Sequence, residues 1–93
     1  MYARLMADIL RLRGEQVEWR EAEGEVVVLD LTDSSYFAVN KTGAAVWSQL
    51  AEGSTRDDLV ANMTARFEVD EATAARDVDA FLDSVRARGL LSA

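Results

Sequence analysis

The sequence predicts an α+β domain of the winged helix-turn-helix type, in which a three-stranded antiparallel β-meander precedes three α-helices. Between about residues 9 and 40, apolar residues alternate with polar ones or form short β-branched runs. Between about residues 42 and 90, they recur at spacings of three and four. Short turn sequences separate these segments. About half of the 93 residues are apolar, which is enough for one hydrophobic core and one domain.

Three short strands joined by turns are expected in the first half. Residues 17–20 alternate apolar with polar side chains, as in a half-buried strand. Glu23 and Gly24 supply a turn, and the β-branched segment 26–31 is long enough for a strand but short for a helix. After a polar turn, residues 36–39 form the third strand. Consecutive strands with such short connections pair as an antiparallel meander.

The N-terminal stretch admits two interpretations. Its apolar residues form either a short additional strand at Ile9, Leu10 and Leu12, or one face of a helix at Tyr2, Leu5, Met6 and Ile9. Residues 1–8 are therefore assigned only as an N-terminal extension of a single domain spanning residues 1–93. Charged residues interrupt this stretch and no small-residue cleavage site follows it. We expect a cytoplasmic protein without a membrane span.

The first helix of the second half begins near Asn40 or Thr42, either of which can cap it. It is expected to run to about residue 51 and to end at Glu52 and Gly53. Its inner face is predicted to consist of Val46, Trp47 and Leu50. The aromatic side chains assigned to the core are Trp19, Trp47, Phe67 and Phe81.

The second helix follows Ser54 and Thr55, each of which has an aspartate three residues later, as in a capping box. Its apolar side is predicted to consist of Leu59, Val60, Met63 and Phe67. Asp70 can cap the third helix, which is expected from about Glu71 to Arg88. Its apolar stripe is predicted to consist of Ala75, Val78, Leu82 and Val85. Gly89 ends the helix, because glycine readily adopts a left-handed conformation.

The composition argues against catalysis. The chain has no histidine and no cysteine, so it lacks the usual neutral-pH base, thiolate nucleophiles and the ligands of most zinc sites. Asp77, Asp79 and Asp83 on the third helix are interpreted as solvated surface acids. Gly43 follows Thr42 without the glycine-rich loop of a phosphate site, and we expect it to allow close helix-to-strand packing. No enzymatic activity, metal or cofactor is predicted.

The charge argues against nucleic acid and anionic membranes as partners. The chain carries 17 acidic against 10 basic side chains. A winged-helix regulator that binds DNA is the alternative function, because such folds place a helix in the major groove. Between Glu71 and Asp83, however, the third helix has four acids and one base, which gives phosphates little to bind.

A meander leaves its third strand at an edge, where backbone N–H and C=O groups have no partner. The segment from Ser35 to Val39 contains neither charge nor proline, the features that usually protect such an edge. Two interpretations remain open from the residues alone: another element covers the edge, or an added strand pairs with it. The same edge can pair with a second copy, so we expect a monomer or a weak homodimer.

The segment from Tyr36 to Trp47, YFAVNKTGAAVW, resembles the strand-to-helix signature of PqqD-like proteins. That signature consists of an aromatic residue, a short apolar stretch, Asn-x-Thr-Gly or a close variant, and an apolar helix. Other segments resemble the family's second strand, helix break and third helix: Glu25–Asp30, Glu52–Thr55, Phe67–Asp70, Asp77–Val78 and Gly89–Leu91. The similarity extends from about residue 9 to residue 91.

The resemblance implies a recognition element for the precursors of ribosomally synthesised peptide natural products. Such a non-catalytic domain binds the leader peptide as a strand beside its third strand and presents it to a modifying enzyme. The enzyme is a radical SAM maturase or a leader peptidase and cyclase, as in PQQ and lasso-peptide biosynthesis. The candidate peptide-binding residues are Tyr36, Phe37, Ala38 and Val39 on the strand, and Thr73, Arg76, Asp77, Ala80, Phe81 and Ser84 on the third helix. Arg76 is expected to pair with an acidic leader residue and Asp77 with a basic one, whereas Asn40, Thr42 and Gly43 are expected to be structural.

Overall fold

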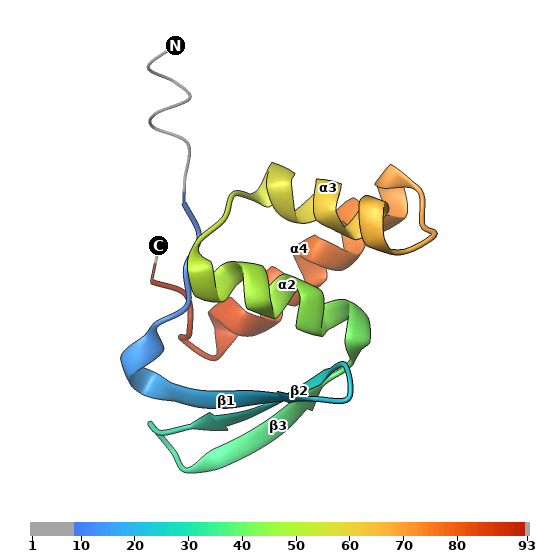
Figure 1. Cartoon of the computed structure of the whole chain (residues 1–93). Helices are drawn as coiled ribbons and strands as arrows, with labels where there is room; N and C mark the ends of the chain where they lie inside the picture. Colours follow the sequence, from blue (N-terminus) through green and yellow to red (C-terminus); the bar gives the residue numbers. More distant parts are fainter. Residues whose placement is uncertain (1–8, 93) are drawn as a thin grey trace.

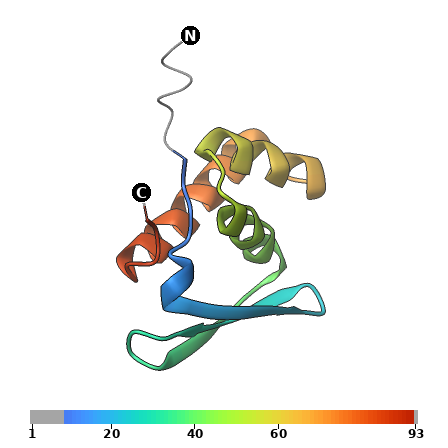
Figure 2. The ribbon, with the colours of Figure 1, turned by 60° about the vertical axis from the view of Figure 1, so that its left-hand side comes forward.

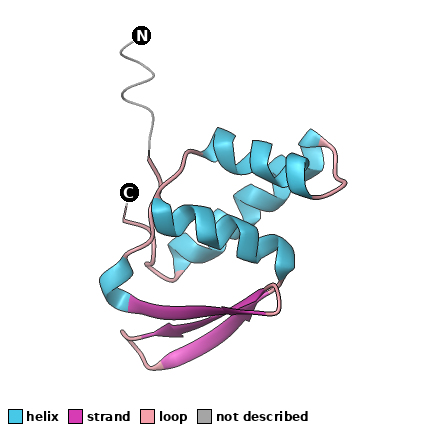
Figure 3. Ribbon diagram, viewed as in Figure 1, coloured by secondary structure: helices cyan, strands magenta, loops and turns pink. Residues whose placement is uncertain are grey.

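The computed structural model describes residues 9–92, and its elements follow the predicted order (Figure 1). A short 3₁₀ helix precedes three strands and three helices: η1 (Gly14–Gln16), β1 (Val17–Ala22), β2 (Glu25–Asp30), β3 (Ser35–Val39), α2 (Lys41–Glu52), α3 (Arg56–Arg66) and α4 (Glu71–Ala87). The helices lie on one side of the sheet and leave its other face uncovered (Figure 3). The predicted α+β class, with a meander followed by helices, is confirmed.

The sheet is antiparallel with the order β1-β2-β3, so β1 and β3 both lie at its edges. Glu23 and Gly24 form the two-residue turn between β1 and β2, and their φ angles of 56° and 84° are those that tight hairpin turns require. Along β2, Val26 and Val28 are buried against the helices, whereas Val27 points to the uncovered face.

The ambiguous N-terminal stretch is extended where the structure describes it. Leu10 and Ser54 exchange backbone hydrogen bonds, with N–O distances of 2.6 and 2.9 Å, and Leu12 forms a bridge with Leu91. Figure 2 shows this segment passing beside the C-terminal end of α4. Residues 1–8, which include Tyr2, Leu5 and Met6 of the alternative helix, lie outside the described residues. The segment from residue 9 to 13 therefore packs at the helical side of the molecule.

Each helix begins at a predicted capping side chain. The caps accept backbone N–H hydrogen bonds as follows: Asn40 from Gly43 at 3.0 Å, Thr55 from Asp58 at 3.2 Å and Asp70 from Thr73 at 2.7 Å. Of the paired candidates, Asn40 rather than Thr42 and Thr55 rather than Ser54 are the caps. The hydrogen bond from the Thr73 N–H lowers the pKa of Asp70, because it stabilises the carboxylate.

Trp47 occupies the centre of the core and has no solvent exposure. Its ring meets those of Trp19 and Phe37 edge-on, each at a centroid distance of 6.2 Å. Thus one aromatic side chain of α2 joins a residue of each edge strand. In the part of the chain that the structure describes, no helix combines the length and apolar character needed to cross a membrane.

Two core predictions were wrong in detail. The buried row of α4 begins with Ala74, and Ala75 is only partly buried, because successive helical residues lie about 100° apart and Ala74 shares the face of Val78. Trp19 is 38% exposed, because it lies on an edge strand that is covered on one face only. Phe67 and Phe81 are partly buried against the core.

The surface acids of α4 are exposed, as predicted. The Arg56 guanidinium donates two hydrogen bonds to the Asp79 carboxylate, at 2.7 and 2.9 Å, and thereby links α3 to α4. This contact holds the pKa of Asp79 below its ordinary value. Asp77 and Asp83 lie on either side of it along the helix, both open to solvent.

Candidate functional site

β3 forms a free edge of the sheet. Its pairing with β2 runs from Val26↔Val39 to Asp30↔Ser35, and no other segment within residues 9–92 pairs with it. The described N-terminal residues Leu10 and Leu12 pair with Ser54 and Leu91, not with β3. In the described part of the chain, the edge is therefore open.

The strand register identifies which backbone groups of β3 point outward. The Leu31 N–H donates to the Gln16 carbonyl at 2.8 Å, on the β1 side of β2. Because backbone groups alternate in direction along a strand, every second residue from Val26 to Asp30 points toward β3. Their partners, which are consequently hydrogen-bonded to β2, are Ser35, Phe37 and Val39. The N–H and C=O groups of Tyr36 and Ala38 therefore point away from the sheet.

The side chains of β3 alternate between the two faces of the sheet. Phe37 and Val39 face the helices and are partly or fully buried. Tyr36 and Ala38 point to the uncovered face, and Tyr36 is 76% exposed. The strand thus offers backbone hydrogen-bonding groups from one pair of residues and apolar side-chain surface from the other pair.

A groove lies between β3 and α4. Its first part, with a volume of about 290 Å³, is lined by residues 37–40 together with Phe81, Ser84, Val85 and Arg88. A second part of about 380 Å³ lies beyond the end of β3, where residues 40 and 42–43 meet Asp77, Ala80 and Phe81. Asn40 and Phe81 line both parts, so the two hollows adjoin. We call them together the β3–α4 groove.

The structure brings most of the predicted site residues to this groove. On the strand, Phe37, Ala38 and Val39 line it, whereas Tyr36 contributes outward backbone groups beside it. The predicted helix residues that line it are Asp77, Ala80, Phe81 and Ser84. Thr73 lies in the first turn of α4, at the Asp70 cap, and Arg76 lies about 100° around the helix from Asp77. Neither lines the groove.

Arg88 is a groove residue that was not predicted from the sequence. The central carbon of its guanidinium lies 3.9 Å from the centre of the Phe37 ring, in cation–π geometry. Arg88 follows Ser84 by one helical turn, so the row that contains Asp77, Phe81 and Ser84 leads directly to it. This spacing is the sequence signal that could have identified Arg88. Val85, assigned only to the core stripe, also borders the groove.

Gly43 sets the distance between α2 and the groove walls. A Cβ atom at this position would lie 2.6 Å from Cγ1 of Val39 and 3.1 Å from Cε1 of Phe81. The predicted packing role of Gly43 is therefore confirmed. Because Val39 ends β3 and Phe81 lies on α4, this glycine allows both walls of the groove to approach the start of α2.

Replacing Gly43 with alanine is expected to lower the free energy of unfolding by about 1–3 kcal/mol. The stiff, β-branched Val39 side chain has to move, and this cost exceeds the roughly 1 kcal/mol by which alanine favours a helix over glycine. Urea unfolding followed by circular dichroism measures the effect. Ala45→Gly is the matched comparison, since it loses helix propensity without a clash. A Gly43→Ala protein as stable as the wild type would contradict the close packing.

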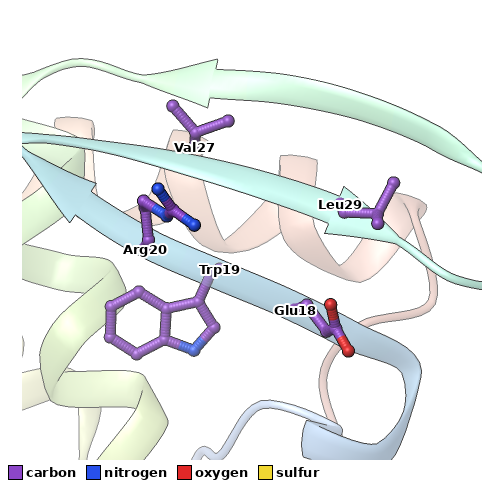
Figure 4. A pocket seen from close by; sticks show the side chains of 5 residues that line it. All are labelled: Glu18, Trp19, Arg20, Val27 and Leu29. Atoms are coloured by element: carbon purple, nitrogen blue, oxygen red, sulfur yellow. The ribbon is translucent and has the colours of Figure 1, made fainter.

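The uncovered face of the sheet carries a separate hollow of about 440 Å³. Figure 4 shows its lining residues, which are Glu18, Trp19 and Arg20 on β1 and Val27 and Leu29 on β2. These residues belong to β1 and β2, so the hollow does not include the outward backbone groups of Tyr36 and Ala38. We therefore assign the candidate site to the β3–α4 groove, which lies beside those groups.

Comparisons with known proteins agree with this architecture. The family model described as coenzyme PQQ synthesis protein D (PqqD) matches residues 25–91. A structure of TbiB1 in complex with the TbiA(beta) leader peptide has a TM-score of 0.80 and is 30% identical, covering 88% of this chain and 94% of that chain. A lasso peptide synthetase B1 complexed with the leader peptide has a TM-score of 0.77 and is 26% identical, covering 90% of this chain and 98% of that chain. No curated protein matches the chain. Because the family model covers well over half of its residues, the chain belongs to the PqqD family.

Proposed function

We propose that this domain binds the leader of a ribosomally synthesised precursor peptide as an additional strand along β3 and presents it to a modifying enzyme. The observation that carries the proposal is the open edge of β3, whose outward groups at Tyr36 and Ala38 lie beside the β3–α4 groove. Membership of the PqqD family and the leader peptides in the two similar structures support it.

In strand addition, backbone hydrogen bonds contribute affinity for any extended peptide, and side-chain contacts contribute specificity. The outward N–H and C=O groups of Tyr36 and Ala38 offer four hydrogen bonds, each with a net value of roughly 0.5–1.5 kcal/mol. Every second side chain of the guest then points toward the groove. Ordering a flexible peptide costs part of this free energy, so the groove contacts decide which peptides bind tightly.

In this function, the domain recognises the peptide and another protein carries out the chemistry. The chain has neither histidine nor cysteine, the side chains most often used as bases and nucleophiles. A radical SAM maturase or a leader peptidase and cyclase would act on the presented peptide. This step would take place in the cytoplasm, where ribosomes supply the precursor.

No observation favours the alternative, DNA binding. Between Glu71 and Asp83, α4 carries four acidic side chains and one basic side chain. Such a helix repels the phosphate backbone, which supplies most of the affinity of DNA-binding helices. The two similar structures hold leader peptides.

Residue-resolved amide exchange tests the proposal. Synthetic leaders of precursor peptides encoded next to this protein's gene are added to the ¹⁵N-labelled domain. The amides of Tyr36 and Ala38 are expected to exchange rapidly without peptide and at least about tenfold more slowly with it, because a hydrogen bond then protects them. The amides of Phe37 and Val39 serve as the internal control, since their ladder with β2 protects them in both states. Leaders that bind while Tyr36 and Ala38 stay unprotected would exclude strand addition at β3.

A further inference from the structure

We infer that the β3–α4 groove selects the order of charges along its guest strand, with a basic residue at the Asp77 end and an acidic residue at the Arg88 end. This inference rests on the proposed function and adds the direction and spacing of the guest. It follows from the charges that mark the two ends of the groove.

Arg88 offers a free positive charge at one end. Within residues 9–92, the ion pairs of arginines involve Arg56 and Arg86 but not Arg88. The face of its guanidinium lies over the Phe37 ring, which leaves the N–H donors in the guanidinium plane available to a carboxylate. The carboxylate of Asp33 accepts hydrogen bonds from the hydroxyl and N–H of Ser35, which lower its pKa, and the nearby charge of Arg88 lowers this pKa further. Among the described residues, Asp33 forms no ion pair with Arg88.

Asp77 offers a negative charge at the other end. Its side chain is exposed and lines the part of the groove beyond Asn40. Within the described residues, Asp77 takes part in no ion pair, whereas the neighbouring Asp79 is held by Arg56. A lysine or arginine of the guest therefore meets an acid that forms no ion pair with a cation of residues 9–92.

The helix between these two ends presents only neutral side chains to the groove: Ala80, Phe81, Ser84 and Val85. Arg88 lies eleven positions after Asp77, which corresponds to about 16 Å along the helix axis. An extended peptide covers this length with about five residues. Two opposite charges about five residues apart, with an uncharged stretch between them, therefore match the groove.

The direction of the guest follows from the course of β3 and α4. Arg88 lies at Phe37 and Asp77 lies beyond Asn40, so α4 runs opposite to β3. A guest that pairs antiparallel to β3, as every strand pair of this sheet does, begins at the Asp77 end. Its basic residue therefore precedes its acidic residue in sequence. A peptide with the two charges exchanged meets like charges at both ends.

Selection from a random twelve-residue peptide display library tests this charge order. Peptides selected by the wild-type domain are expected to carry Lys or Arg four to six residues before Asp or Glu. The double variant Asp77→Arg, Arg88→Glu is expected to select the opposite order. Arg76→Glu is the matched control, because this residue is also exposed on α4 but does not line the groove, and it should select the wild-type order. Exchanging the two charges of a selected peptide should weaken its binding to the wild type about five- to tenfold, and less in high salt.

The outcomes separate this inference from the proposed function. Selected peptides whose binding depends on Ala38, but whose charges show no order or the same order in the double variant, overturn the charge selection and leave strand addition intact. Failure to select any peptide that distinguishes the wild type from Ala38→Pro counts against both. If the double variant does not fold, the neutral pair Asp77→Asn, Arg88→Gln should still abolish the preference, and a preserved preference overturns the inference.

Discussion

Replacing Ala38 with proline is expected to weaken leader binding about tenfold while the domain remains folded. The Ala38 N–H points away from β2, so proline removes a donor to the guest without breaking the existing ladder. One lost hydrogen bond costs roughly 0.5–1.5 kcal/mol, and the ring also obstructs the neighbouring backbone. A total near 1.4 kcal/mol corresponds to about a tenfold change in Kd. Isothermal titration with a cognate leader measures it.

Ala38→Thr is the matched control for this variant. Threonine keeps the N–H and favours a strand, and its side chain extends over the uncovered face of the sheet. Its Kd should stay within about twofold of the wild type. Unchanged affinity of the folded Ala38→Pro protein would place the peptide elsewhere on the domain. Circular dichroism of both variants separates loss of binding from loss of structure.

Replacing Trp47 with alanine is expected to lower the free energy of unfolding by about 3–5 kcal/mol. The side chain is fully buried and joins α2 to both edge strands through Trp19 and Phe37. Because a domain of this size has a total stability of roughly 5–15 kcal/mol, the variant should unfold at much lower urea concentration or be largely unfolded without urea. Equilibrium urea unfolding gives the difference.

Two further substitutions show whether burial explains the loss. Trp19→Ala removes an indole that is 38% exposed, so its cost should be clearly smaller, about 1–2 kcal/mol. Trp47→Phe should also cost less than Trp47→Ala, because phenylalanine refills part of the space. Phenylalanine also removes a buried indole N–H that has no hydrogen-bond partner in the described residues. Equal losses for Trp19→Ala and Trp47→Ala would refute the central role of Trp47.

The sequence by itself determined the type and order of the three strands and three helices, and their ends to within about two residues, because these depend on neighbouring residues. The caps Asn40, Thr55 and Asp70 each accept an N–H three residues ahead, a distance that helix geometry fixes locally. The turn at Glu23 and Gly24 needs only two residues that accept positive φ. The resemblance carried by residues 36–47 agrees with the match of the PqqD family model.

Only the tertiary structure decided which side of α4 faces β3 and whether another described segment covers the edge of β3. A shift of one residue turns a helical side chain by about 100°, so apolar periodicity defines the buried stripe but not the flank that meets the sheet. Thus Arg76 was selected from the sequence, whereas Arg88 lies in the groove. The pairing of Leu10 with Ser54 depends on where the chain returns after α2, which no local pattern encodes.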